Sequence, residues 1–578
     1  MKRLAVSTWL ILVAANLAGL AVAQSNAGHV SLVQDWSHRH VRYSNTGTPQ
    51  QRVNLMKEPR ALHTYLDRTW LPALQHSRSA LTRSNQASRT TYSEDFRGGP
   101  FRNGRYPQRP TWPKNLNSKV DWALSLGRGG PFPIGETPAK FQFDVNLAPS
   151  CTNDFAVFPI NATPKASQAN LIAVNNLYSG TNPTGQCGAA PTVMWAYRLG
   201  SAGIALSPVL SLDGKQVAVV ESGTSTAVLH VLTWKSGQGT SATSPYSGTP
   251  ADKTVSYTTV AGTGCTNSAA TVSNASPYVD YIGDGAFVAA DNGILYHIKG
   301  VFNGTPAMDF CTVVSANTAL TSPVYDENAG KVFISDGASV YSFNFSPATG
   351  FSSRTTITVA GAGGIILSPI IDPSSQMMYV FSSSNAAGTN SIVSQIPYSL
   401  ASHTDVAIGA AATGYVLDGA FDNNFYTSSN PATWTLYACG RTAASGTAPA
   451  LYGISFNASG VLNTTPLFSG NTSLNPGGAG GTCSPLAEFA NGGVDRLFVS
   501  TTGSNTVSMY DITNRLTGTS APSATAAGYN GGTGNFAVDN TSSLPQASSI
   551  YFGTLGTSNT TCGTGTYCAV KLTQGALK

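Results

Sequence analysis

The feature that most constrains this chain is a short phrase that recurs along it. Each copy opens with Ser-Pro and continues as a β-rich run, a turn and a second β-rich run, as in SPVYDENAGKVFISDGASVYSF. Five copies begin at Ser207, Ser276, Ser322, Ser368 and Ser484. The first four starts are 69, 46 and 46 residues apart, and the next interval of 116 residues leaves room for a weaker copy at Tyr415. Another weak copy begins at Ala537, and an N-terminal candidate begins at Cys151.

This period indicates the fold. Repeats of roughly 40–50 residues that carry several short strands are typical of β-propeller blades. One such sheet cannot bury both of its faces, whereas radial stacking covers them. Only 10% of the residues are charged, against roughly 25% in an average soluble domain, and the many Gly residues suit a turn-rich all-β chain. We predict an all-β fold, a β-propeller of seven or eight blades over residues 141–578.

The Ser-Pro phrase has a structural and a catalytic interpretation. Proline fits the first residue of a strand, where no donor is needed for the ladder. In four of the five copies an acid stands four residues after the serine: Asp280, Asp326, Asp372 and Glu488. These acids fall at the first hairpin turn, where Asp accepts from backbone N–H groups. We favour this structural interpretation over a catalytic Ser–acid pair.

The repeats resemble those of PQQ-type and YVTN-type β-propellers. Their pattern is Ser-Pro-x-x-Asp, a Val-Tyr-Val-like strand, Asn/Asp-Gly and a strand such as ILYHI. Phrases such as NDFAVF, PTVMWAYRLG and YCAVKLTQ are similar to a group of uncharacterised secreted bacterial β-propeller proteins. The resemblance covers about residues 141–578 and implies the fold, while a propeller by itself implies no activity.

The N-terminal 140 residues differ from the repeats. Lys2 and Arg3 precede an apolar run that ends in Ala-Val-Ala, which predicts a signal peptide over residues 1–23. A membrane anchor is the alternative, and no later segment is apolar and long enough to span a bilayer. Residues 24–140 form a basic Arg/Pro-rich arm. Within it we expect one amphipathic helix at about 59–80 and a flexible, disordered linker after it.

The charge is divided unevenly between arm and repeats. Residues 24–140 carry 17 Lys/Arg against 7 Asp/Glu, and residues 141–578 carry 13 against 20. A basic arm suits an anionic envelope polymer or another extracellular protein as partner. Export argues against nucleic acid. The expected location is secreted, extracellular or periplasmic, and an incidentally charged linker is the alternative.

Eight cysteines fit an oxidising compartment. None forms a CxxC pair, and sequence order suggests four local disulfide bonds among 105 formal pairings. The predicted pairs are Cys151–Cys187, Cys265–Cys311, Cys439–Cys483 and Cys562–Cys568.

Catalytic motifs are scarce in the repeats. No HExxH, GxSxG or GxxxxGKS occurs, and the three histidines, His230, His297 and His403, are expected to be structural. A Ca²⁺ site through Asp284, Asp291 and Asn292 competes with hairpin-turn chemistry, which we favour. We therefore assign no catalytic residue, metal or cofactor. The expected function is binding or scaffolding without catalysis, and the alternative is a carbohydrate-active or quinone-dependent (PQQ-type) enzyme.

Overall fold

The structure is a computed structural model. It describes residues 32–46, 60, 119–142, 149–180, 185–223, 227–258, 265, 270–411, 416–442, 448–474, 481–491, 493–540, 548–557 and 562–573. The proposed signal peptide and linker lie outside the described residues, as does the expected helix at 59–80 apart from Arg60. Among the described residues, no helix combines the length and the apolar character that crossing a membrane requires.

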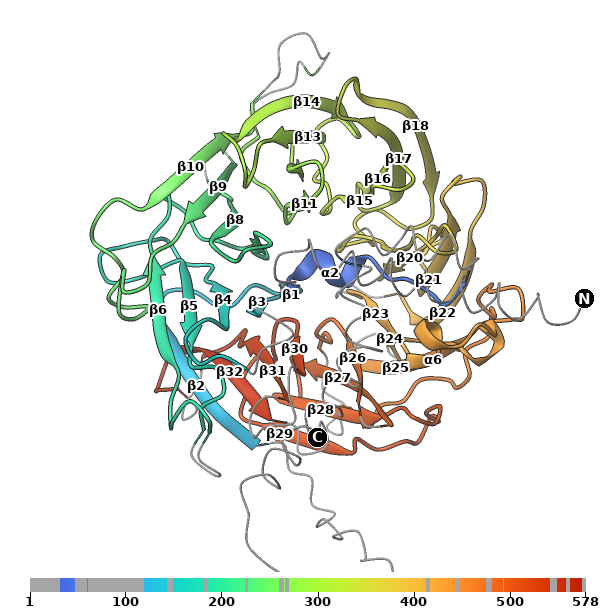
Figure 1. Cartoon of the computed structure of the whole chain (residues 1–578). Helices are drawn as coiled ribbons and strands as arrows, with labels where there is room; N and C mark the ends of the chain where they lie inside the picture. The colour runs from blue at the N-terminus through green and yellow to red at the C-terminus, as the bar shows by residue number, and fades with distance from the viewer. Residues whose placement is uncertain are drawn as a thin grey trace, which may run out of the picture.

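Eight antiparallel sheets are arranged around a central axis (Figure 1). The protein is therefore an eight-bladed β-propeller, and the choice between seven and eight blades is resolved. Blade 1 contains β1 (Leu32–Gln34), β3 (Ala139–Gln142), β4 (Phe155–Pro159), β5 (Leu171–Asn175) and β6 (Thr192–Tyr197). Blade 2 contains β7 (Val209–Leu210), β8 (Gln216–Glu221), β9 (Val228–Thr233) and β10 (Ala251–Ser256). Blade 3 contains β11 (Tyr278–Asp280), β12 (Gly285–Ala289), β13 (Ile294–Lys299) and β14 (Ala307–Val313). Blade 4 contains β15 (Val324–Asp326), β16 (Lys331–Ser335), β17 (Ser339–Ser346) and β18 (Gly350–Thr358).

The second half of the ring follows the same plan. Blade 5 contains β19 (Ile370–Asp372), β20 (Met377–Ser382), β21 (Asn390–Pro397) and β22 (Thr404–Ala410). Blade 6 contains β23 (Gly419–Phe421), β24 (Thr435–Arg441) and β25 (Pro449–Ser455), with the short helices α6 (Asn423–Thr427) and η2 (Pro431–Thr433) between its strands. Blade 7 contains β26 (Ala487–Asn491), β27 (Val494–Thr501), β28 (Thr506–Asp511) and β29 (Ala524–Ala527). Blade 8 contains β30 (Ala537–Asn540), β31 (Ser548–Gly553), β32 (Tyr567–Thr573) and β2 (Lys119–Gly127).

The first strand of each repeat lies near the axis and the last lies at the rim (Figure 1). Burial follows from this order, because middle strands are covered on both faces by neighbouring blades. Every residue of β12 is buried, whereas β10 at the rim has no buried residue. Strands covered on both faces carry continuous apolar runs rather than alternating ones, which is why the repeats contain phrases such as QVAVV.

Three strands begin before residue 141. β2 pairs antiparallel with β32 and completes blade 8 from the N-terminal side of the chain, and β1 and β3 pair with each other in blade 1. The sheets therefore extend further toward the N-terminus than the repeats indicate, and blade 8 combines strands from both ends of the chain.

The contacts of the Ser-Pro phrase support its structural interpretation. Asp280 accepts from the N–H groups of Ile282 and Gly283, each at 3.0 Å, and Asp326 accepts from Ala329 at 3.1 Å. These acids end the first strand of a blade and cap the hairpin turn that follows.

Four disulfide bonds join the four pairs that sequence order predicts: Cys151–Cys187, Cys265–Cys311, Cys439–Cys483 and Cys562–Cys568. Cys439 lies in β24 and Cys483 precedes β26, so that bond connects blades 6 and 7. Four disulfides fit a protein that folds in an oxidising compartment.

Candidate functional site in the axial channel

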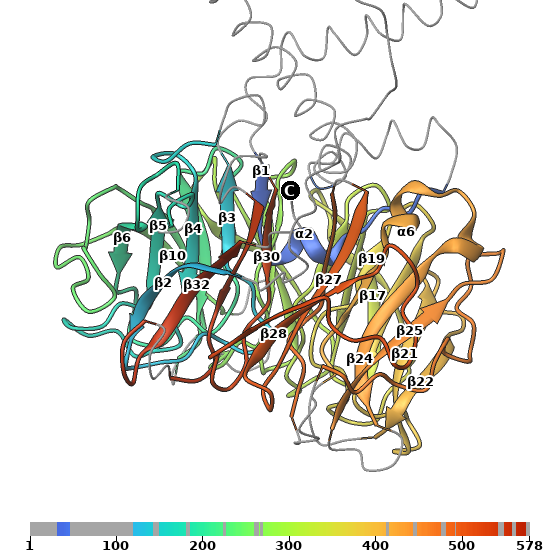
Figure 2. The same ribbon diagram turned by 90° about the horizontal axis from the view of Figure 1, so that it is seen from below.

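The centre of the ring is occupied by the chain's own residues 32–46, which we call the plug segment. It begins as β1, where Val33 pairs with Phe141 of β3. The chain then turns into the single-turn helix α2 (Trp36–His40), whose N-cap is Asp35. The Asp35 carboxylate accepts from the N–H groups of Ser37 at 3.1 Å and His38 at 3.3 Å, as helix N-caps do. Figures 1 and 2 show α2 between the blades near the axis of the ring.

The plug segment contacts blades on several sides of the channel. The indole N–H of Trp36 donates to the carbonyl of Pro277 before β11, at 2.9 Å. Further along, the N–H of Arg42 donates to Ile371 O of β19 at 2.8 Å, and that of Asn45 donates to Phe425 O of α6 at 2.9 Å. The plug segment is therefore held by blades 1, 3, 5 and 6, through backbone hydrogen bonds and the indole hydrogen bond of Trp36.

A buried ion pair attaches the plug segment between blades 6 and 7. The Arg39 guanidinium lies 2.9 Å from Oδ2 of Asp418 and donates to the carbonyl of Leu486 at 2.6 Å. Burial lowers the pKa of Arg39 to about 10 although Asp418 counteracts it, and burial raises the pKa of Asp418. Removing either partner would leave an uncompensated charge in the channel.

His40 stays neutral at physiological pH. It is 4% exposed, and its Nδ1 lies 3.4 Å from the carbonyl of Pro369. Burial, together with the charge of Arg39, lowers its pKa to about 3. Protonation of His40 would therefore destabilise the position of the plug segment in the channel, because the charged ring would be buried beside Arg39.

The serines of the Ser-Pro phrases line the axis and link neighbouring blades. The N–H of Ser207 donates to Ser276 Oγ at 3.0 Å, and the N–H of Ser276 donates to Ser322 Oγ at 2.7 Å. Oε2 of Glu136 accepts from the Ser207 N–H at 2.9 Å and from the Ser276 hydroxyl at 2.8 Å. Burial raises the pKa of Glu136, and the serine hydrogen bonds counteract this. This Glu136–serine cluster is satisfied within the chain.

A pocket opens where the plug segment meets blades 7 and 8, and we call it the mouth pocket. Its lining includes Gln34, Arg42, Thr137, Glu488, Phe489 and Val538. Arg42 is half-buried, so its cation is accessible from this pocket. The pocket combines a cation, an anion, an amide and apolar surface, which suits recognition of a polar group by several weak contacts.

The three residues considered for Ca²⁺ do not converge. Asp284 precedes β12 and accepts from the N–H of Phe302 at 2.8 Å, whereas Asp291 and Asn292 follow the other end of β12. Asp291 accepts from Thr271, and Asn292 donates to the Tyr296 hydroxyl at 2.7 Å. In the part of the chain that the structure describes, no three His, Cys, Asp or Glu side chains are grouped as a metal ion would require.

The three histidines of the repeats lie far from the axis, each beside an acid. His230 lies 2.6 Å from Asp252 and 3.1 Å from Glu221, His297 lies 2.7 Å from Asp309, and His403 lies 2.7 Å from Asp405. Burial lowers the pKa of His230, but the hydrogen bonds to Asp252 and Glu221 outweigh it and raise the pKa to about 9.

The sequence analysis did not assign the plug segment. One local signal was present, because Asp35 followed by Trp36 and Ser37 is a helix start with an aromatic residue to bury. A helix of five residues leaves too short a sequence pattern to be distinguished from a linker in an Arg-rich region.

The fold and the channel define a class: eight-bladed β-propellers whose axial channel is filled by their own N-terminal segment. No protein-family model matches the chain, and no curated protein matches it in sequence. Among solved structures, Sqt1 of Chaetomium thermophilum is similar at 10% identity and a TM-score of 0.45, covering 80% of this chain and 98% of that one. BamB of Moraxella catarrhalis is similar at 11% identity and a TM-score of 0.38, covering 79% and 98%. A putative 6-phosphogluconolactonase of Bacteroides uniformis is similar at 16% identity and a TM-score of 0.37, covering 64% and 98%. These similarities concern the fold, and no function follows from them.

Proposed function

We propose that this protein is a secreted binding or scaffolding protein that acts at the cell exterior without catalysis. The supporting observation is that the polar groups at the axis are already paired within the chain: Arg39 of the plug segment pairs with Asp418, and Glu136, which precedes β3, accepts from Ser207 and Ser276. A carbohydrate-active or quinone-dependent enzyme, the alternative, would need reacting groups that face open space. The surfaces that remain for recognition are the rims, the mouth pocket and the basic arm.

The partner we propose is an anionic polymer of the cell envelope. The support is the charge division, 17 Lys/Arg against 7 Asp/Glu over residues 24–140, of which three cations, Arg39, Arg60 and Lys140, are buried. Thirteen of these cations are Arg, whose planar guanidinium matches carboxylate and phosphate groups. Arg42, which also belongs to residues 24–140, lines the mouth pocket and is one cation of this segment that such a polymer could reach.

Co-sedimentation of the full mature protein with an insoluble carboxylated polysaccharide tests this proposal, with an uncharged polysaccharide as control. We expect binding that weakens steeply between low and high salt, because exposed charges are screened within about 10 Å at 0.1 M salt. Replacing Arg89, Arg97, Arg102, Arg105 and Arg109 with Gln should abolish most of the binding. The matched control replaces five exposed cations of the repeats with Gln, namely Lys165, Lys215, Lys235, Lys253 and Arg354. Equal losses in the two variants, or no binding at low salt, would overturn the proposed partner.

A further inference from the structure

Five buried charged residues lie where the last blade meets the first. Lys140 in β3 and Asp154 before β4 belong to blade 1, and Asp539 in β30, Lys571 in β32 and Asp121 in β2 belong to blade 8. Their exposed fractions are 1%, 2%, 0%, 0% and 7%. Buried charges on this scale are rare unless they are paired or serve chemistry.

The two lysines have different surroundings. Lys571 lies 3.1 Å from Asp121 and 5.8 Å from the ring centre of Tyr178, and Asp121 also accepts from the Thr573 hydroxyl. Nζ of Lys140 lies 3.1 Å from Oδ2 of Asp539. Within the described residues, it has no hydrogen-bond partner beyond that ionic contact. An ammonium group has three donors, so Lys140 as an ammonium is poorly satisfied in a dry site.

The third carboxyl group can hold a proton. Three carboxyl groups face two amines, so the cluster is neutral when one acid is protonated. Oδ2 of Asp154 accepts from the Tyr178 hydroxyl at 2.5 Å and from the Ser150 N–H at 3.0 Å. Burial raises the pKa of Asp154, against the opposing charge of Lys140 and with a further rise from Asp539. Asp154 is therefore a buried acid close enough to feel both members of the Lys140–Asp539 pair.

We propose that Lys140 and Asp539 condense to an isopeptide bond that joins the first and last blades covalently. The Lys140 amine attacks the carboxyl carbon of Asp539, a C–N bond forms, the C–O bond to the hydroxyl breaks, and water leaves. An ammonium and a carboxylate become one amide and one water, so no oxidant, reductant or other reactant is required. Asp154 passes the proton from the attacking nitrogen to the departing hydroxyl.

The buried site favours the reaction for a physical reason. An ion pair in a dry interior loses much of its hydration, and its mutual attraction compensates only when every donor is satisfied. A neutral amide has one N–H and one carbonyl, and so removes two charges and most of the unsatisfied donors of Lys140. Both aspartates have a further hydroxyl donor, Thr573 for Asp121 and Tyr551 for Asp539. The two pairs differ at the lysine: Lys571 also lies over the Tyr178 ring, so the Lys571–Asp121 pair gains less from condensation.

The bond would be a covalent cross-link between blade 1 and blade 8. Residues 140 and 539 lie far apart in sequence but on inner strands of adjacent blades, β3 and β30, so a bond between them encloses the six intervening blades and the remaining strands of blade 1. Cross-links that close long loops restrict the unfolded chain most strongly. This cross-link lies between the first and last blades, where the ring is closed by non-covalent contacts alone when the bond is absent.

Mass spectrometry of the full mature protein tests the proposal. After reduction of the disulfides, we expect an intact mass lower than that of the sequence, counted from the observed N-terminus, by one water molecule. Tryptic mapping should show a branched peptide joining the segments around Lys140 and Asp539, with no cleavage after Lys140. An unmodified mass with normal cleavage after Lys140 would overturn the proposal, as would a water loss that maps elsewhere.

Three variants assign the chemistry to these residues. Lys140→Met should restore the full mass. Asp539→Asn should lose ammonia in place of water, because an amide is then the group attacked. The double variant Lys571→Met with Asp121→Leu is the matched control and should keep the water loss, since it removes the other ion pair and leaves no unpaired charge. Where Lys140→Met does not fold, the branched peptide and the ammonia loss decide the question, and water loss from Asp539→Asn would contradict it.

Discussion

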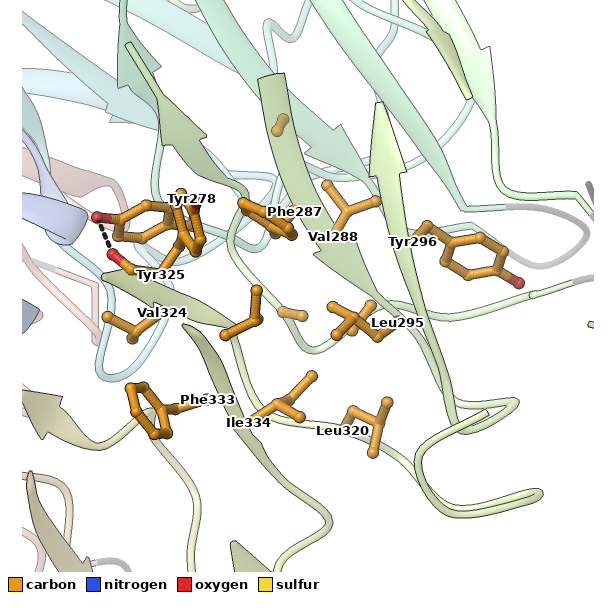
Figure 3. Close-up of a cluster of buried hydrophobic side chains, with 14 of the residues drawn as sticks. Tyr278, Phe287, Val288, Leu295, Tyr296, Leu320, Val324, Tyr325, Phe333 and Ile334 are labelled. Atoms are coloured by element: carbon orange, nitrogen blue, oxygen red, sulfur yellow. Dashed lines mark hydrogen bonds between the residues drawn. The ribbon is translucent and has the colours of Figure 1, made fainter. Parts of the chain in front are cut away.

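Two interfaces between neighbouring blades are buried in different ways. Between blades 3 and 4 the contact is aromatic and aliphatic (Figure 3). The Phe287 ring lies 4.8 Å from those of Tyr325 and Phe345, and the Tyr278 hydroxyl donates to Tyr325 O at 2.7 Å. Between blades 8 and 1, Trp122 of β2 packs in one apolar cluster with Phe158 of β4, and its indole N–H donates to the carbonyl of Leu177 at 3.0 Å. This apolar packing is combined with the buried lysines and carboxylates.

The difference shows what each kind of contact contributes. Apolar burial is non-directional and stabilises any pair of blades that brings such surfaces together. A buried ion pair adds little net stability, but a mismatched one is costly. We therefore infer that the charged contacts make ring closure specific. The Lys571–Asp121 pair favours one register of β32 against β2 within blade 8, and the Lys140–Asp539 pair favours one placement of blade 1 against blade 8.

The largest expected effect is on the apolar interface. Phe287→Ala should lower the free energy of unfolding by about 3–5 kcal/mol, because it removes a buried ring and leaves a cavity among rigid neighbours. Denaturant titration followed by tryptophan fluorescence measures the change. Ile282→Ala is the control, since Ile282 is 56% exposed, and its change should stay within about 0.5 kcal/mol. Similar losses in both variants would show that blade 3 and blade 4 are not held by this cluster.

The next prediction tests whether the buried Lys571–Asp121 ion pair stabilises the protein more than apolar side chains at the same two positions would. Lys571→Met alone should lower the free energy of unfolding by about 3 kcal/mol, because Asp121 then stays buried without its cation. Adding Asp121→Leu should restore wild-type stability or exceed it, because two well-packed apolar side chains replace the ion pair. The same titration measures both variants. A double variant as unstable as the single one would mean that the ion pair stabilises the ring outright.

The plug segment should respond more weakly, because it can leave the channel while the blades stay closed. Trp36→Ala removes roughly 1.5–3 kcal/mol of apolar burial. Trypsin cleavage after Arg39 and Arg42 should then accelerate on the order of tenfold or more, since about 1.4 kcal/mol corresponds to a factor of ten. N-terminal sequencing of the products locates the cuts. Unchanged cleavage would mean that Trp36 does not hold the segment in place.

The smallest effect concerns a charged contact near the rim of blade 2. Because its folded pKa of about 9 lies above the ordinary 6.5, His230 stabilises the fold fully below pH 6.5, and this stabilisation is lost as pH rises toward 9. The difference between wild type and His230→Gln should be about 1.5 kcal/mol at pH 6, typical of hydrogen bonds to charged groups, should shrink as pH rises to 9, and should vanish only above that pH. Unfolding titrations across this range provide the measurement. A difference that does not depend on pH would show that His230 contributes by packing.

The regular part of this molecule could be predicted from the sequence. The Ser-Pro phrases indicated the blades, and Asp280 and Asp326 cap turns as their position indicated, because these features depend on residues a few positions apart. The four disulfides followed sequence order because each closes a loop within one blade or between adjacent blades. The number of blades needed the structure, since only the pairing of β2 with β32 shows how the two ends share blade 8.

What the sequence determined by itself is therefore local: a propeller repeat, its turns and its cysteine pairs. The tertiary structure decided the plug segment in the channel, the Glu136–serine cluster and the buried lysine–aspartate cluster. The physical reason is distance along the chain. Lys140 and Asp539, or Trp36 and the Pro277 carbonyl, meet only after the ring has closed, and no local pattern records a contact between residues that the whole fold brings together.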